Sequence, residues 1–130
     1  DLKRLMETDF HPVTMDTTLG DVVRLISSVR RNIFPVVSRD GVLLGVVQLD
    51  DLRADMFDPA KYDTKIDAYM IPPPDVVYPN AQMGSVLDAF EQSKAWMLPV
   101  IDSDRHYLGF ISKSRILAAY RDQLVAISEE

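Results

Sequence analysis

The sequence contains no cysteine. Disulfide bonds, thiolate zinc sites and thiol catalysis are therefore excluded. Histidine is almost as scarce, and the two that are present, His11 and His106, are too few and too scattered to indicate a metal site. We expect both histidines on the surface or in loops.

Long apolar runs are missing as well. The longest, residues 42–47, is interrupted by Gly45 and is far too short to cross a bilayer. No secretory signal opens the chain, and its first residue, Asp1, leads us to expect a fragment of a larger protein. Basic residues are outnumbered 14 to 20 by acidic ones, which gives a net charge of −6. Because binding to a phosphate backbone requires a basic face, no nucleic-acid partner is expected.

The sequence motifs of common enzyme classes are also absent. There is no nucleophile elbow, P-loop, metal-ligand cluster or paired histidine and acid. Asp50 and Asp51 are adjacent, so on a helix they point about 100° apart and cannot form a facing carboxylate pair. We therefore expect a protein that is not an enzyme.

The most informative feature present is an internal repeat with an offset of 64 residues. Without any gap, this offset aligns Gly20 with Gly84, Pro35 with Pro99, Gly45 with Gly109, Met6 with Met70, Val13 with Val77, Val22 with Val86, Val36 with Val100, Asp40 with Asp104 and Leu44 with Leu108. A unit of half the chain length buries too little surface to be comfortably stable alone, so we expect the two copies to share a core.

The first copy has the pattern of a β-α-β-β-α unit. An extended piece at 12–14 precedes a helix whose apolar residues, from Leu19 to Val29, follow helical spacing, and Thr18 with Asp21 predicts a capping box. Strands at 33–37 and 42–47 are joined by a tight turn at Asp40 and Gly41, and a second helix follows at about 50–56.

The second copy repeats this pattern. Its expected elements are an extended piece at 76–78, a helix through Met83 and Phe90, strands at 97–101 and 107–111, and a helix at about 113–127. A short helix at 65–70 matches one at 2–6. The strands are continuously apolar, which predicts that both faces are covered, and Pro35 and Pro99 belong at an edge or strand start.

The predicted fold is therefore α/β (α+β), with two β-α-β-β-α repeats packed with pseudo-twofold symmetry. We assign residues 1–57 to the first repeat, 58–64 to a connector and 65–130 to the second repeat. The strand that opens with glycine reads GVVQLDD at 45–51 and GFISKSR at 109–115. This pattern, with its proline-valine strand, resembles the CBS domain, and two copies in tandem resemble the CBS pair called a Bateman module.

A finer likeness concerns the stretches at 49–53, 56–59, 96–100, 109–114 and 119–121. They resemble the cytoplasmic tail of bacterial voltage-gated chloride channels or exchangers. The resemblance implies the cytoplasmic domain of an inner-membrane protein, itself soluble, attached to a transmembrane portion of the same polypeptide. It also implies a homodimer that associates through the CBS helices.

The family resemblance further implies a regulatory adenine nucleotide, AMP, ADP or ATP, in a cleft between the repeats, with no cofactor required. By this resemblance Asp51 binds the ribose hydroxyls, and Gln48 stands where a phosphate-contacting hydroxyl is usual. The adenine pocket comes from Val77, Tyr78, Trp96 and Met97. The residues implied for a second, weaker cleft are Thr14, Arg31, Asn32, Ser112 and Arg115; Arg115 cannot accept a hydrogen bond, so it is expected to hold a phosphate.

Simpler roles remain open for these residues. Asp51 fits equally well as an exposed acid that stabilises its helix dipole, Trp96 and Tyr78 fit core or interface packing, and Arg31 fits a solvated helix end. The alternatives for the whole chain are a purely structural dimerisation module without a ligand and a nucleotide sensor attached to another protein.

Overall fold

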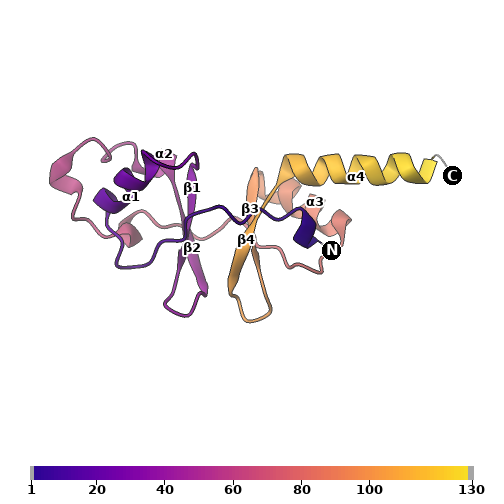
Figure 1. Ribbon diagram of the computed structural model, residues 1–130, viewed down its shortest axis with the longest axis horizontal. Coiled ribbons are helices and arrows are strands. Elements are labelled where there is room, and N and C mark those ends of the chain that lie inside the picture. The colour runs from indigo at the N-terminus through magenta and orange to yellow at the C-terminus, as the bar shows by residue number, and fades with distance from the viewer. Residues whose placement is uncertain (1, 129–130) are drawn as a thin grey trace. The chain divides into compact units, whose positions relative to one another are not determined.

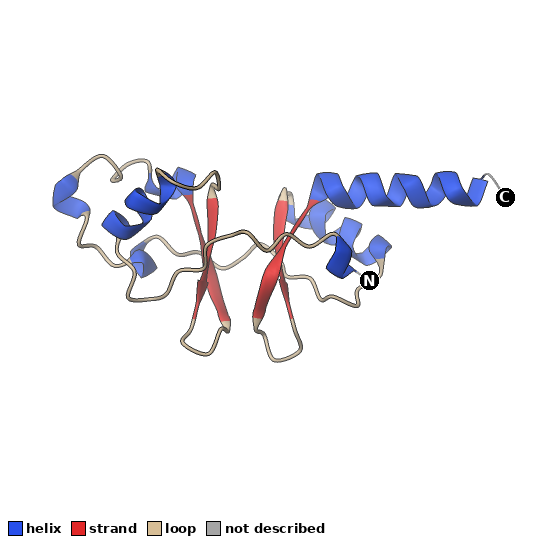
Figure 2. Cartoon of the chain, in the orientation of Figure 1, coloured by secondary structure: helices blue, strands red, loops and turns tan. Residues whose placement is uncertain are grey.

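A computed structural model describes residues 2–128 as a mixed structure of short helices and two small sheets (Figures 1 and 2). The elements in chain order, with η marking a 3-10 helix, are η1 (Leu2–Arg4), α1 (Leu19–Ile26), β1 (Ile33–Val37), β2 (Leu43–Gln48), α2 (Leu49–Leu52), η2 (Pro59–Lys61), η3 (Ile66–Ala68), α3 (Met83–Ser93), β3 (Met97–Ile101), β4 (Tyr107–Ser112) and α4 (Lys113–Ser128). The predicted α+β fold class is confirmed.

The chain forms two compact units. The first unit is residues 10–72, and the second unit combines the described parts of 1–9 and 73–130. The first residues of each sequence repeat, its leading segment, thus pack in the unit of the other repeat. In the second unit Glu7 bridges Phe110 of β4, and in the first unit Ile71 bridges Val46 of β2. The bounds at 57 and 65 divide the chain by sequence repeat and stay a prediction, whereas these units follow contacts in space.

The first unit is built on the antiparallel β1–β2 hairpin, in which Ile33 lies opposite Gln48. Val13 adds a parallel bridge on the other side of β1, where its N–H donates to the Pro35 carbonyl and its carbonyl accepts from Val37. The main buried cluster of this unit is Val13, Leu19, Val22, Phe34, Val36, Val47, Leu52 and Ile66. They come from α1, α2, η3, the hairpin and the bridging residue Val13, so apolar positions predicted for the first repeat, such as Leu19 and Val22, lie in this core.

The start of α1 is fully hydrogen-bonded. The Thr18 hydroxyl accepts from the Asp21 N–H, and the Asp21 carboxylate accepts from the Thr18 N–H, which confirms the predicted capping box. The next two donors bond to the connector, because Leu19 N–H donates to the Thr64 carbonyl (2.8 Å) and Gly20 N–H to the Tyr62 carbonyl (3.0 Å). The connector, residues 58–64, therefore supplies acceptors for N–H groups at the start of α1.

The second unit repeats the same arrangement. Met97 lies opposite Ser112 in the β3–β4 hairpin, and Val77 adds the parallel bridge to Val100. The buried cluster is Leu2, Val77, Val86, Phe90, Leu98, Val100, Ile111 and Ile116. Its last helix, α4, is the longest described, yet among residues 2–128 no helix has both the length and the apolar character needed to cross a bilayer.

Both prolines lie in the middle of their strands rather than at the start. Pro35 is opposite Val46, and Val46 directs its own N–H and carbonyl to Ile71, away from β1. The Pro35–Val46 pair is thus not a hydrogen-bonded one, so the N–H that proline lacks is not needed by the hairpin. Each sheet has only two strands, which makes every strand an edge strand, as predicted for Pro35 and Pro99.

The second helix of the first repeat is shorter than predicted. It was expected over about 50–56, but α2 ends at Leu52. The chain then turns, with the Leu52 carbonyl accepting from both Asp55 and Met56, and the Met56 carbonyl accepts from the Tyr62 hydroxyl (2.8 Å). The contact with Tyr62, six residues away, favours a turn over a continued helix. Similarly, the short helices expected at 2–6 and 65–70 are single 3-10 turns.

Candidate functional site

Six of the predicted ligand residues lie at two equivalent places, one in each unit. In the first unit Asn32, Gln48 and Asp51 lie at the open end of the β1–β2 hairpin, opposite its turn. The offset of 64 places Trp96, Ser112 and Arg115 at the same end of β3–β4. Each open end has an equivalent backbone hydrogen bond. Leu49 N–H donates to the Asn32 carbonyl (2.8 Å), and Lys113 N–H donates to the Trp96 carbonyl (2.9 Å).

The two open ends differ in chemistry although their backbones match. The first-unit end offers amides and carboxylates, whereas the second-unit end offers an indole ring, a hydroxyl and cations. An acidic end suits hydroxyl donors such as a ribose, and a cationic aromatic end suits phosphates and flat rings. The repeats therefore offer different contacts to a ligand.

Asp51 is exposed in the first turn of α2, and no hydrogen bond to it is found among residues 2–128. Its neighbour Asp50 is engaged differently, because its Oδ1 accepts from Arg53 Nε at 2.8 Å. Gln48 occupies the N-cap position of α2, but its side chain makes no capping hydrogen bond. Asp51 and Gln48 thus both keep hydrogen-bonding groups available to a ligand.

Arg31 and Thr14 serve local structure in the first unit. The Arg31 guanidinium carbon lies 4.0 Å from the centroid of the Phe10 ring, and Phe10 is only 4% exposed. This cation–π contact holds Arg31 against the unit, which differs from a solvated helix end. The Thr14 N–H donates to the Thr17 hydroxyl (3.1 Å), while its side chain is exposed. Sequence reasoning missed Phe10, which carries no motif.

Trp96 lies at the second-unit end and is 71% exposed. It is therefore not a core residue of its unit. Lys113 Nζ lies 5.1 Å from the Trp96 ring centroid and 3.3 Å from Glu91 Oε1. The Lys113 ammonium, paired with Glu91, therefore lies beside the Trp96 ring, and most of the Trp96 side chain remains exposed. Neither Lys113 nor Glu91 was among the predicted site residues.

Ser112 is buried and caps α4. Its hydroxyl accepts from the Arg115 N–H at 3.2 Å, the bond expected of an N-cap serine. The exposed Arg115 guanidinium reaches the Leu5 carbonyl at 3.5 Å, a long contact. The Ser112 hydroxyl implied for the second cleft is thus already used within the protein, whereas Arg115, expected to hold a phosphate, is only weakly held.

Val77 and Tyr78 lie away from Trp96. Val77 is 3% exposed and its side chain belongs to the core. Tyr78 is 43% exposed and lines a pocket of about 410 Å³ with Asp102 and Leu108, beside the hairpin turn. At about 3.3 Å per strand residue, this is roughly 16 Å along β3 from Trp96. The backbones of Trp96 and Tyr78 thus lie at different positions along β3, and a shared adenine pocket stays a prediction.

His106 lies in the β3–β4 turn, as expected for a loop residue. Asp102, Asp104 and His106 place potential metal-ligand atoms within 4.8 Å of one another. Asp102 Oδ1 accepts from the N–H groups of Asp104 (2.9 Å) and His106 (2.8 Å), and Oδ2 lies 3.1 Å from His106 Nδ1. These bonds, the His106 N–H first, hold the pKa of Asp102 below its usual value. The turn itself accounts for this cluster.

Comparison with known proteins gives a family match to both repeats. A family model described as the CBS domain matches residues 2–58 and again 66–122. The two ranges are displaced by the offset found in the sequence. A protein of Methanocaldococcus jannaschii described as uncharacterized is 30% identical over 108 residues, which is 81% of this chain and 38% of that protein. The chain therefore spans well under half the length of this relative.

Solved structures share the fold. CBSX2 in complex with AMP is 24% identical, with a TM-score of 0.76 over 92% of this chain and 94% of that one. The CBS domain of a bacterial CNNM/CorC family Mg²⁺ transporter in complex with ATP is 19% identical, with a TM-score of 0.77 over 89% of this chain and 83% of that one. At these identities the likeness concerns the fold.

Proposed function

Since the chain belongs to the CBS domain family, as two copies in tandem, we propose that it is a regulatory module that binds an adenine nucleotide. The observation that carries this proposal is the family match over both repeats. Two proteins of the same fold were solved with AMP and with ATP, which supports this class of ligand. The absence of catalytic motifs supports regulation rather than catalysis.

We propose Asp51 as the ribose-binding residue, because its exposed carboxylate has room to accept from two vicinal hydroxyls. Gln48 at the same open end contributes an amide. From the second repeat we propose Trp96 as the residue that stacks on the base, because its ring is exposed and its carbonyl accepts from the Lys113 N–H. Met97 adjoins it, whereas Val77 can contribute only its backbone and Tyr78 only a separate contact.

A second, weaker set of contacts is proposed for Thr14, Arg31, Asn32, Ser112 and Arg115. Its cations favour a phosphate, and Arg115 is the more available of the two, because Arg31 is stacked on Phe10. Ser112 would have to give up its helix cap to bind a phosphate, which argues against that role.

A thermal-shift titration of the whole chain with AMP, ADP, ATP and S-adenosylmethionine tests the proposal. A nucleotide at about a hundredfold excess over its Kd adds about 2.7 kcal/mol to the free energy of unfolding. We expect a rise in Tm with at least one adenine nucleotide and none with GMP at the same concentration. Folded protein whose Tm responds to none of them would contradict the nucleotide-sensing function.

The finer proposal is that the module regulates a chloride channel or exchanger of which it forms the cytoplasmic part. The stretches at 49–53, 96–100 and 109–114 support it, because they resemble such tails. Deletion of this segment from a full-length transporter is expected to remove nucleotide control of transport while leaving the transport itself. Unchanged nucleotide control would reject this assignment and leave a sensor attached to another protein.

Dimerisation through α4 is a second candidate function, favoured by one observation. Leu117, Tyr120, Leu124 and Ile127 recur at helical spacing on one side of α4, and all are at least 37% exposed. A matched pair of variants tests it. Leu124 and Val125 are 49% and 50% exposed, but adjacent residues point about 100° apart.

We expect Leu124→Glu to lower the mass measured by light scattering from dimer to monomer, with Val125→Glu retaining the dimer. A monomeric wild-type chain, or equal effects of the two substitutions, would reject this stripe as the dimer contact. If Asp51→Ala leaves every property unchanged while Leu124→Glu dissociates the dimer, the module is a structural one.

A further inference from the structure

The indole of Trp96 is held at the second-unit open end by one neighbour, Lys113. The Lys113 N–H donates to the Trp96 carbonyl at 2.9 Å, and Lys113 Nζ lies over the indole, 5.1 Å from the ring centroid. Trp96 is nevertheless 71% exposed. The ring therefore has a cation against it while most of its surface stays open to solvent, and such a contact favours one orientation of the ring.

Glu91 on α3 fixes the lysine in this place. Its Oε1 lies 3.3 Å from Lys113 Nζ, and the Lys113 side chain is only 20% exposed, which is low for a residue type found mostly at the surface. An ion pair with one exposed partner adds little to the stability of a fold. Its effect here is to restrict the ammonium to a position next to the indole.

The place of Lys113 in α4 does not favour the helix. Lys113 is the first residue of α4, and the first turn contains no acidic residue. The helix dipole opposes a positive charge at this end. The favourable contacts of the ammonium are therefore those with Glu91 and the Trp96 ring, rather than with the helix that it begins.

This arrangement belongs to the second repeat alone. The offset of 64 aligns Glu91 with Ser27, Trp96 with Asn32 and Lys113 with Leu49. The first repeat thus has neither a ring nor a charge at the equivalent positions. The duplicated fold does not require the contact, so its origin lies in what distinguishes the second open end from the first.

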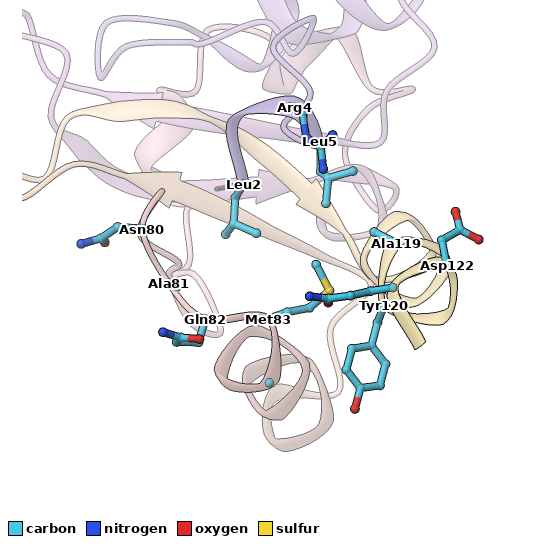
Figure 3. Close-up of a pocket in the computed structure, with 12 residues that line it drawn as sticks. Leu2, Arg4, Leu5, Asn80, Ala81, Gln82, Met83, Ala119, Tyr120 and Asp122 are labelled. Atoms are coloured by element: carbon cyan, nitrogen blue, oxygen red, sulfur yellow. The ribbon is translucent and has the colours of Figure 1, made fainter. Parts of the chain in front are cut away.

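Exposure of an aromatic ring is not sufficient to bring a cation to it. Tyr120 on α4 is 37% exposed and lines a groove of about 960 Å³ between η1, the start of α3 and α4 (Figure 3). Arg4 lines the same groove, yet no cation–π contact with Tyr120 is found within residues 2–128. The contact between Lys113 and Trp96 is therefore a specific feature of this open end.

We propose that Lys113, held by Glu91, is a positioning residue that fixes the Trp96 ring for stacking on the base of an adenine nucleotide. The inference rests on the proposed function, which assigns Trp96 to the base. A ring that is already fixed in the free protein loses less conformational entropy when a base stacks on it. Because Glu91 compensates the charge of the ammonium, Lys113 contributes equally to the binding of adenosine and of its phosphates.

The first test measures the motion of the ring without any ligand. Trp96 is the single tryptophan of the sequence, so time-resolved fluorescence anisotropy of the full chain reports this ring alone. We expect Lys113→Met, which keeps an unbranched apolar side chain and removes the charge, to raise the amplitude of the fast component about twofold or more. Lys113→Arg, which restores a cation able to stack and to pair with Glu91, is expected to return it to the wild-type value.

The matched control is Lys94→Met. Lys94 is exposed and precedes Trp96 by two residues, but no contact of its side chain with the ring is found in the described part of the chain, residues 2–128. The substitution removes the same charge without removing the contact, so we expect the fast component to stay at the wild-type amplitude.

The second test is calorimetric titration of adenosine and of ATP into the wild type and Lys113→Met. We expect the substitution to weaken both ligands by the same factor, about three- to tenfold, because a free ring has to be immobilised on binding. A lysine that bound the phosphate would instead weaken ATP alone.

An unchanged fast component in Lys113→Met would overturn the proposal, as would a loss of affinity confined to ATP. An equal rise in Lys94→Met would also overturn it, because the effect would then come from charge in general. The anisotropy does not depend on ligand binding. If Lys113→Met frees the ring while the wild type binds neither adenosine nor ATP, the failure is that of the proposed function, and the restraint of Trp96 by Lys113 is confirmed.

Discussion

Gly45 lies directly against the side chain of Met70. A Cβ built at Gly45 would come within 2.6 Å of Met70 Cγ and 2.8 Å of the Ile71 carbonyl oxygen. The same relationship recurs at Gly109, where a Cβ would meet Met6 Cγ at 2.8 Å and the Glu7 carbonyl oxygen at 2.6 Å. In both units a leading segment crosses the hairpin at a glycine, so the exchange of leading segments depends on these two residues.

Gly45→Ala is expected to destabilise the protein by about 1–3 kcal/mol, because the methyl group overpacks against backbone atoms that cannot move freely. The matched control is Gly84→Ala, where nothing lies within 4 Å and a helical alanine adds up to about 1 kcal/mol. Urea denaturation measures both. Equal stabilities of the Gly45 variant and the wild type would show that the leading segment does not pack this closely.

A second prediction concerns the residue with a positive φ in each hairpin turn and its effect on stability. Gly41 has a φ of 85°, and its repeat counterpart Arg105 has a φ of 67°, a left-handed conformation that costs a side chain about 1–2 kcal/mol. Arg105→Gly is therefore expected to stabilise the protein by about 0.5–1 kcal/mol after the entropic cost of glycine. Gly41→Ala should destabilise it. A less stable Arg105→Gly variant in thermal denaturation would mean that the arginine side chain has a contact that outweighs the strain.

Stability is expected to fall in acid because of two turn and cap carboxylates. The Thr18 backbone N–H, then its hydroxyl and Arg24, lower the pKa of Asp21 below 3.8, and the His106 N–H lowers the pKa of Asp102. Each contribution is present above the ordinary pKa and is lost as the pH falls through the lower pKa of the folded state.

Urea denaturation at pH 6, 4 and 3 should thus show a loss of stability that is smaller in Asp21→Asn. The Thr18→Ala substitution, which removes the cap itself, is expected to cost about 1 kcal/mol at pH 6. An identical pH dependence for Asp21→Asn and the wild type would contradict the capping role of this carboxylate.

Trp96 makes nucleotide binding directly observable, because it is the single tryptophan of the sequence and is 71% exposed. Its emission is expected to be that of a solvated indole and to shift to shorter wavelength when AMP or ATP binds. Stacking is worth about 1–3 kcal/mol, so Trp96→Ala should weaken binding about tenfold or more in calorimetry. Trp96→Phe, which keeps a ring, is the control. A nucleotide that binds without altering the emission would place the base elsewhere.

Much of the fold followed from the sequence because its signals are local. The Thr18–Asp21 cap, both hairpins and the helix after Gln82 depend on residues a few positions apart. The course of the chain after Leu52 did not follow, since the turn is held by Tyr62. The exchange of leading segments depends on contacts distant in sequence, Glu7 with Phe110 and Val46 with Ile71, which periodicity does not reveal.

The candidate site was predicted less completely. The sequence pattern located the open ends of both hairpins, because the glycine-containing strand ends there. It could not show that Ser112 caps its own helix, nor that Arg31 stacks on Phe10. It grouped Tyr78 with Trp96, which the strand register separates. Side-chain partners of this kind depend on the packing of the unit rather than on spacing.

Calorimetric titration of AMP and ATP into Asp51→Asn and Asp50→Asn variants of the chain is the sharpest test of nucleotide binding at Asp51. The two acids are neighbours and both are exposed, but Asp50 is paired with Arg53 and Asp51 has no such partner among residues 2–128. We predict that Asp51→Asn weakens nucleotide binding at least about tenfold, because a charge-assisted bond to the ribose is lost, while Asp50→Asn binds like the wild type. Equal binding by both variants and the wild type would contradict the assignment of Asp51, and a wild-type chain that takes up no nucleotide would contradict the sensing function itself.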